Sequence, residues 1–185
     1  MTTHLVLGGA RSGKSAYAEK LATDTNLPVI YIATAQVFDD EFKARVQHHK
    51  DRRPSHWKIV EEPHLLSDAL QGSWLLASGA SKNSPLKQCV IIDCLTLWLA
   101  QCICPDCAPI EGIDWNEQRA KFLAILPTLD ADIIIVSNEV GMGIVPLGEI
   151  NRQFQDEQGR LNQAVAAIAD NVSFIAAGLP IKLKG

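Results

Sequence analysis

A glycine-rich segment near the start of the sequence constrains the fold more than any other feature. Residues 8–15 match the pattern G-x-x-x-x-G-K-[S/T] with Gly8, Gly9, Ala10, Arg11, Ser12, Gly13, Lys14 and Ser15. An apolar run at residues 5–7 precedes the segment, and a helix-forming stretch at residues 15–23 follows it. A loop in this setting turns its backbone N–H groups around a phosphate at the N-terminus of the helix. The sequence therefore predicts a phosphate-binding P-loop; a glycine-rich turn with a solvated lysine is the less favoured alternative.

Two side chains at the end of this loop have predicted roles. Lys14 would neutralise the β- and γ-phosphate oxygens, and the Ser15 hydroxyl can bind Mg²⁺. A P-loop also needs an acidic residue at the end of a neighbouring strand to hold the metal or its water. Asp93 follows the apolar run at residues 89–92 and meets this requirement, with an ordinary strand-end aspartate as the alternative. Together these residues predict a site for a nucleoside triphosphate and magnesium.

Short apolar runs recur along the chain with helix-sized segments between them. They lie at residues 5–7, 29–32, 57–60, 89–92, 133–136 and 172–175. Such runs are typical of parallel strands that are buried on both faces. Helices are predicted at residues 15–23, 39–52 and 150–169. The pattern predicts an α/β fold, a single P-loop (RecA-like) domain over residues 1–185 with a mostly parallel sheet and helices on both faces.

Composition and charge exclude several classes of protein. The chain has 185 residues, of which 47% are hydrophobic, and this argues against a disordered protein. Its 17 basic and 21 acidic residues give a net charge of −4, so a general nucleic-acid binder is not expected. No apolar run approaches the roughly 20 residues of a bilayer span, and no charged leader precedes the first strand. With five cysteines, an odd number, these features predict a cytoplasmic protein with reduced thiols and no transmembrane segment.

A basic segment at residues 43–53 carries a candidate nucleophile. On a helix, Arg45, Arg52 and Arg53 would share the face of His49. Guanidinium groups match phosphate geometry, and their charge would keep the imidazole neutral with a free lone pair. A neutral imidazole beside phosphates can attack a phosphoryl or nucleotidyl group. A solvated basic helix face is an equally open alternative, whereas metal binding by His48 and His49 is disfavoured because adjacent helical residues point about 100° apart.

Several segments, taken together and in order, resemble a known enzyme family. They are residues 8–15, 31–35, 47–54, 92–99, 136–146 and 159–163. The family is the adenosylcobinamide kinase/adenosylcobinamide-phosphate guanylyltransferase of cobalamin biosynthesis. Residues 138–146 are its most specific match, whereas the P-loop pattern alone would not distinguish it. The resemblance extends over almost the whole chain.

The resemblance implies a bifunctional enzyme that uses GTP and ATP as substrates. It would first phosphorylate the aminopropanol hydroxyl of adenosylcobinamide, and then transfer GMP from GTP onto that phosphate through a guanylyl-histidine. The histidine of the family's H-x-x-R-R pattern falls on His49, followed by Arg52 and Arg53, and His48 is the adjacent competitor. Lys14 and His49 are therefore the expected catalytic residues. The family also implies a homotrimer.

The resemblance further implies which residues bind the nucleotide. Besides the P-loop, they are Ala33, Thr34, Ala35, Lys50, Asp51, Arg52, Arg53, Glu61 and Asp93. The Glu61 carboxylate can accept hydrogen bonds from guanine or from ribose hydroxyls, and an exposed strand-end glutamate is its alternative. Asn138 and Glu139 follow the apolar run at residues 133–136 and are expected to position nucleotide or substrate, because α/β folds bind ligands at the carboxyl ends of strands.

Two other functions stay open, and one segment departs from the family. A simple P-loop kinase would use the histidine helix only as a lid, and a non-catalytic module would bind nucleotide without turnover. Residues 78–86 and 102–112 are expected to be surface loops. The second contains Cys102, Cys104 and Cys107 and is not part of the family's motif set. Free thiols are favoured there over a zinc site.

Overall fold

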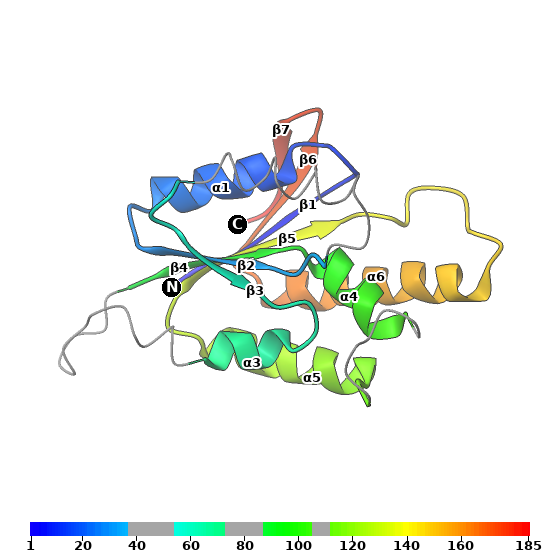
Figure 1. Cartoon of the computed structure of the whole chain (residues 1–185). Coiled ribbons are helices and arrows are strands. Elements are labelled where there is room, and N and C mark those ends of the chain that lie inside the picture. The colour runs from blue at the N-terminus through cyan, green and yellow to red at the C-terminus, as the bar shows by residue number, and fades with distance from the viewer. Residues whose placement is uncertain (37–53, 73–86, 105–111) are drawn as a thin grey trace.

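The computed structural model describes residues 1–36, 54–72, 87–104 and 112–185, which are built around one β-sheet (Figure 1). In these ranges seven strands form the sheet in the order β3-β2-β4-β5-β1-β6-β7. They are β1 (Thr3–Gly8), β2 (Val29–Ala33), β3 (Lys58–Glu61), β4 (Cys89–Asp93), β5 (Asp132–Asn138), β6 (Asn171–Ala176) and β7 (Leu179–Lys184). All neighbouring strands are parallel except β6 and β7, which are antiparallel. The mostly parallel sheet is confirmed.

Helices cover both faces of this sheet. On one face lies α1 (Lys14–Asp24), and on the other lie α3 (Leu66–Gln71), α4 (Leu95–Ile103), α5 (Trp115–Ile125) and α6 (Glu149–Ile168) (Figure 1). A short 3₁₀ turn (Leu126–Thr128) follows α5. Because side chains alternate along a strand, β4 places Val90 and Ile92 in the larger apolar cluster with α4, α5 and α6, and Ile91 in the smaller cluster with α1. The α/β fold with two covered faces is therefore as predicted.

A half-buried carboxylate joins α5 to α6. Glu157 Oε2 accepts hydrogen bonds from Trp115 Nε1 at 2.8 Å and from Arg119 at 2.9 Å, and Oε1 accepts one from Arg160 at 2.5 Å. Burial by itself raises the pKa of Glu157, but the hydrogen bonds from Trp115 and Arg160 and the two arginine charges outweigh it. The pKa of Glu157 therefore lies below its ordinary value, and this contact stabilises the folded state while the carboxylate is charged.

The six predicted strands are all present, and most elements outside them were not predicted. The helices predicted at residues 15–23 and 150–169 correspond to α1 and α6. The helix predicted at residues 39–52 and the loop at residues 78–86 lie outside the described residues. The sequence patterns did not indicate α3, α4, α5 or β7. Within the described ranges, no helix is both long and apolar enough to cross a membrane.

The cysteines need two corrections. α4 extends to Ile103, so Cys102 lies on a helix and is only 7% exposed, not in the predicted surface loop. Cys104 is disulfide-bonded, so the expectation of a free thiol is wrong at this position, and Cys107 lies outside the described residues. Cys89, Cys94 and Cys102 are free, and burial raises the pKa of each of these thiols to about 12. These three thiols are therefore protonated packing groups at neutral pH.

The turn between β6 and β7 packs against the glycine-rich loop. Ala177 and Gly178 have positive φ angles of 50° and 79°, as in a two-residue type I′ hairpin turn. The Gly178 N–H donates to the Ser12 carbonyl at 2.8 Å. A Cβ on Gly13 would lie 3.1 Å from Gly178 Cα. The β6–β7 hairpin is therefore a support for the loop that follows β1.

Candidate active site

The loop between β1 and α1 requires glycine at two positions. Gly8 has a φ of 153°, and a Cβ on it would lie 2.5 Å from the Ile175 carbonyl oxygen and 2.7 Å from Ser12 Oγ. Gly13, just before α1, has a φ of 102°. At these φ angles, and with these contacts, any residue with a Cβ would strain the backbone. The glycines of the motif thus allow the tight strand–loop–helix geometry that the sequence predicted.

The Lys14 side chain is folded back into this loop. Lys14 is only 7% exposed, and its Nζ donates to the Gly9 carbonyl at 2.5 Å. Burial lowers the pKa of the Lys14 ammonium, and the nearby Cys94 and Asp93 oppose this shift only in part. A partly desolvated cation gains strongly from an anion because few waters screen the charge. The loop therefore presents a positive charge that is suited to phosphate oxygens.

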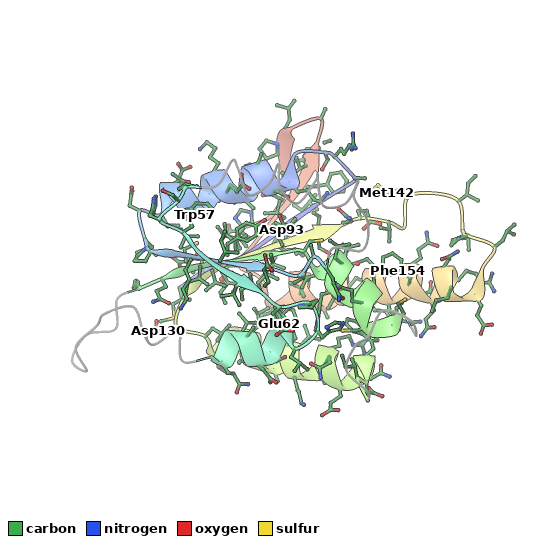
Figure 2. The ribbon with its side chains drawn as sticks, viewed as in Figure 1. Trp57, Glu62, Asp93, Asp130, Met142 and Phe154 are labelled. Atoms are coloured by element: carbon green, nitrogen blue, oxygen red, sulfur yellow. The ribbon has the colours of Figure 1, made fainter. Side chains whose placement is uncertain are left out.

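Asp93 lies at the carboxyl end of β4, on the same side of the sheet as α1 (Figure 2). The Tyr31 hydroxyl donates a hydrogen bond to Asp93 Oδ2, which fixes the carboxylate. Asp93 also lies close enough to Lys14 for its negative charge to favour the charged ammonium and raise the pKa of Lys14. A carboxylate and the hydroxyl of Ser15, at the start of α1, are hard oxygen donors of the kind that Mg²⁺ binds together with phosphates and water. The donor chemistry of these residues therefore fits magnesium.

Thr34 fixes the backbone that follows Asp93. Its hydroxyl donates to the Cys94 carbonyl at 2.7 Å and accepts from the Cys94 N–H at 2.8 Å. Gln101 Nε2 in turn donates to the Thr34 carbonyl at 2.6 Å. Thr34 is 0% exposed, so its hydroxyl is committed to holding the turn between β4 and α4. Any nucleotide contact of this residue stays a prediction.

The structure brings most of the predicted site residues to one edge of the sheet. Glu61 lies at the exposed end of β3, opposite Ala33 at the end of β2, and Ala33 in turn lies opposite Asp93. Ala35 follows β2 and is half-buried. These strand ends and the P-loop share the carboxyl edge, where parallel α/β sheets bind ligands. The remaining predicted residues, His48, His49, Lys50, Asp51, Arg52 and Arg53, lie outside the described residues.

A row of carboxamides on α6 holds the end of β5 at this edge. Gln155 Nε2 donates to the Val140 carbonyl at 2.9 Å, Gln158 Nε2 to Ser137 Oγ at 2.9 Å, and Asn162 Nδ2 to the Asn138 carbonyl at 3.0 Å. Sequence reasoning missed this row. Its signal was present in the spacing of residues 155, 158 and 162, which puts polar amides on the helix face that the apolar Leu161 and Val165 bury.

The next segment joins β5 to the P-loop. The Glu139 N–H donates to the Gly8 carbonyl at 3.0 Å, and Glu139 Oε1 accepts from the Gly141 N–H at 2.6 Å. Beyond it, the chain runs away from the sheet edge to the start of α6, and Met142 lies on this segment (Figure 2). The strand end is therefore tied to the loop that carries Lys14.

Comparison with known proteins agrees with this architecture. The family described as "Cobinamide kinase / cobinamide phosphate guanyltransferase" matches residues 4–183. Two relatives are named bifunctional adenosylcobalamin biosynthesis proteins. CobP of Pseudomonas aeruginosa is 44% identical over 182 residues, covering 98% of this chain and 96% of the relative. CobU of Salmonella typhimurium is 37% identical over 190 residues, covering 97% and 98%.

Solved structures support the fold independently. One solved ATPase domain has a TM-score of 0.52 at 17% identity, covering 94% of this chain and 68% of that one. An ATPase of a bacterial type III secretion system also has a TM-score of 0.52, at 11% identity, covering 98% of this chain and 56% of that one. At these identities the likeness concerns the RecA-like α/β fold alone. The match over nearly the full length decides the family: the chain belongs to the cobinamide kinases / cobinamide phosphate guanyltransferases of adenosylcobalamin biosynthesis, a family of kinases that are also nucleotidyltransferases.

Proposed function

We propose that this protein phosphorylates adenosylcobinamide with ATP or GTP at the P-loop and then transfers GMP from GTP to the new phosphate through a histidine. The observation that carries the proposal is the buried Lys14 ammonium inside a glycine loop, with Asp93 beside it at the carboxyl edge of the sheet. Both reactions are displacements at phosphorus of a nucleoside triphosphate. One domain over residues 1–185 would therefore use the same P-loop for both.

In the first reaction, the substrate hydroxyl oxygen attacks the γ-phosphorus. The bond from that phosphorus to the β–γ bridging oxygen breaks, the nucleoside diphosphate leaves, and the hydroxyl proton passes to solvent or to a base. Lys14 stabilises the charge on the β- and γ-oxygens, and the backbone N–H groups of residues 8–15 orient them. Mg²⁺, held by Ser15 and Asp93 partly through water, would supply further neutralisation of the phosphates.

In the second reaction, a neutral imidazole nitrogen of His49 attacks the α-phosphorus of GTP. Pyrophosphate leaves and a phosphoramidate forms; a phosphate oxygen of the substrate then displaces the histidine and gives adenosylcobinamide-GDP. Support for His49 comes from the sequence, where Arg45, Arg52 and Arg53 share its predicted helix face, and from the H-x-x-R-R pattern of the family. His48 is the runner-up.

The same site would hold the guanine nucleotide through residues at the strand ends and in the basic segment. These are Ala33, Thr34, Ala35, Lys50, Asp51, Arg52, Arg53 and Glu61, together with the P-loop. The exposure of Glu61 at the carboxyl end of β3, opposite Ala33, supports its contact with guanine or ribose.

We place this enzyme in the cytoplasm as a homotrimer. Support for an oligomer comes from the segment between β5 and α6, where Met142, Ile144 and Leu147 are 80%, 96% and 98% exposed. Large apolar side chains that are exposed close together in the sequence favour a surface that a partner covers.

Incubation with GTP labelled at the α-phosphorus tests the histidine step. We expect label on the protein that is lost in acid and retained in alkali, as for a phosphoramidate. The variant His49→Ala should not retain label, whereas His48→Ala should. Full labelling of His49→Ala would refute this assignment, and phosphorylation of adenosylcobinamide without any covalent label would indicate the simple kinase instead.

A further inference from the structure

Asn138, the last residue of β5, has a side chain without a structural task. Its backbone is held on both sides: the N–H donates to Thr96 Oγ1 at 2.8 Å, and the carbonyl accepts from Asn162 Nδ2 at 3.0 Å. Its own carboxamide makes no hydrogen bond to any of the residues that the structure describes, although Asn138 is half-buried. An amide that bonds to no described protein group can bond to water or to a ligand. Its position therefore points to a ligand.

The register of the strands places this amide beside the P-loop. Asn138 lies opposite Gly8 on β1, and Val136, two residues earlier on the same face, lies opposite Asp93 on β4. Ser137 points the other way, because its hydroxyl donates to Asn162 on α6 at 2.7 Å. Since side chains alternate along a strand, the Asn138 side chain is on the α1 face, together with Asp93. This is the face on which α1 presents Lys14.

The surroundings of Asn138 hold in place the backbone from which its amide projects. Gln155 and Gln158 hold the neighbouring Val140 and Ser137, and the Glu139 N–H donates to the Gly8 carbonyl at 3.0 Å. Gln158 is 0% exposed, so these hydrogen bonds are shielded from water. A side chain on a backbone that is held before the ligand arrives loses less entropy on binding than one on a mobile segment.

We propose that the Asn138 Nδ2 amide donates a hydrogen bond to a γ-phosphoryl oxygen of the nucleoside triphosphate. A neutral carboxamide suits this place because β5 lies between the strand that ends in Asp93 and the strand that leads into the P-loop, and the amide adds a donor there without adding charge. Lys14 serves the β- and γ-oxygens from the α1 side, and Asn138 serves the γ-phosphoryl group from the end of β5. The proposal rests on the proposed function only in that the γ-phosphoryl group would be transferred to the corrinoid. The contact between Asn138 and the nucleotide does not depend on that transfer.

Binding measurements with two nucleotides test this assignment. The dissociation constants of ADP and of the β,γ-imido analogue of ATP, both with Mg²⁺, are measured by calorimetry for the wild type and for Asn138→Ala. We expect the variant to lose about tenfold to hundredfold in affinity for the analogue, as for a hydrogen bond to a charged group, with the affinity for ADP unchanged. The isosteric variant Asn138→Asp, which turns a carboxylate toward the phosphate, should lose at least as much. The control Asn151→Ala, on the exposed first turns of α6, should match the wild type.

The outcomes separate this contact from a structural role and from the proposed reaction. The assignment would be overturned if a variant lost the same affinity for ADP as for the analogue. It would also be overturned if neither Asn138→Ala nor Asn138→Asp lost affinity for the analogue. Adenosylcobinamide phosphorylation by the wild type is assayed separately. If the wild type does not phosphorylate the corrinoid but the loss specific to the γ-phosphate is found, the contact stands and the proposed reaction fails. If the wild type phosphorylates the corrinoid but the loss specific to the γ-phosphate is absent, the proposed reaction stands and the contact fails.

Discussion

Replacement of Gly8 by alanine should destabilise the protein much more than replacement of the neighbouring Gly9. At Gly8 the new Cβ would lie 2.5 Å from the Ile175 carbonyl oxygen and 2.7 Å from Ser12 Oγ, and φ is 153°. A side chain in such a backbone region costs about 1–3 kcal/mol, and overpacking against backbone costs about 1–3 kcal/mol more. The sum, about 2–6 kcal/mol, is a large part of the about 5–15 kcal/mol that holds a typical domain folded.

Urea denaturation followed by circular dichroism measures this difference. With a denaturant slope of roughly 2 kcal/mol/M, the midpoint of Gly8→Ala should fall by about 1–3 M. In Gly9→Ala nothing lies within 4 Å of the new Cβ, so its midpoint should stay near that of the wild type. Equal midpoints for the two variants would refute the argument that β6 crowds the first glycine of the loop.

Three further predictions concern other parts of the fold. The variant Glu157→Gln should lose about 1–3 kcal/mol of stability at pH 7. Because the pKa of Glu157 is lowered in the folded state, this loss should disappear as the pH falls through that pKa. A loss of stability that persists in acid would contradict this prediction. The variant Gly159→Ala on α6, with nothing within 4 Å of the new Cβ, should raise the free energy of unfolding by about 1 kcal/mol, and a lower midpoint in urea would count against this. Cys89, Cys94 and Cys102, with pKa values raised to about 12, should react with Ellman's reagent at pH 8 only after denaturation, so rapid labelling of these residues in the native protein would contradict their burial.

The elements that the sequence predicted are those with a strong local signal. The strands β1, β2, β4, β5 and β6 are continuous apolar runs, because both of their faces are buried, and α6 is long and amphipathic. The strand β7 was missed because all its residues are exposed and it contains a proline, which outweighed the short alternation of apolar residues with lysine. α4 was missed because its residues are apolar nearly all round, so no helical period is visible. Tertiary contacts, not local pattern, decide these two elements.

The same division holds for the site. Lys14, Ser15 and Asp93 could be predicted because a motif or a strand end marks them. Thr34 could not be separated from a ligand contact, since only the three-dimensional structure shows its hydroxyl engaged by the Cys94 backbone. The interaction of Tyr31 with Asp93 joins positions far apart in the sequence, and no spacing rule relates them.

The contacts around the P-loop also determine when it can be completed during synthesis. Both strands that flank β1 come from late in the chain, β5 at Asp132–Asn138 and β6 at Asn171–Ala176, and the turn that supports Ser12 follows β6. As the ribosome extends the chain, the loop that carries Lys14 emerges first but has no neighbouring strands until more than a hundred residues later. Contacts at such separations form slowly because a long chain segment must be closed first. The nascent protein therefore cannot present a finished nucleotide site until residue 178 has left the exit tunnel, and a stalled or shortened product would expose the glycine loop without its support.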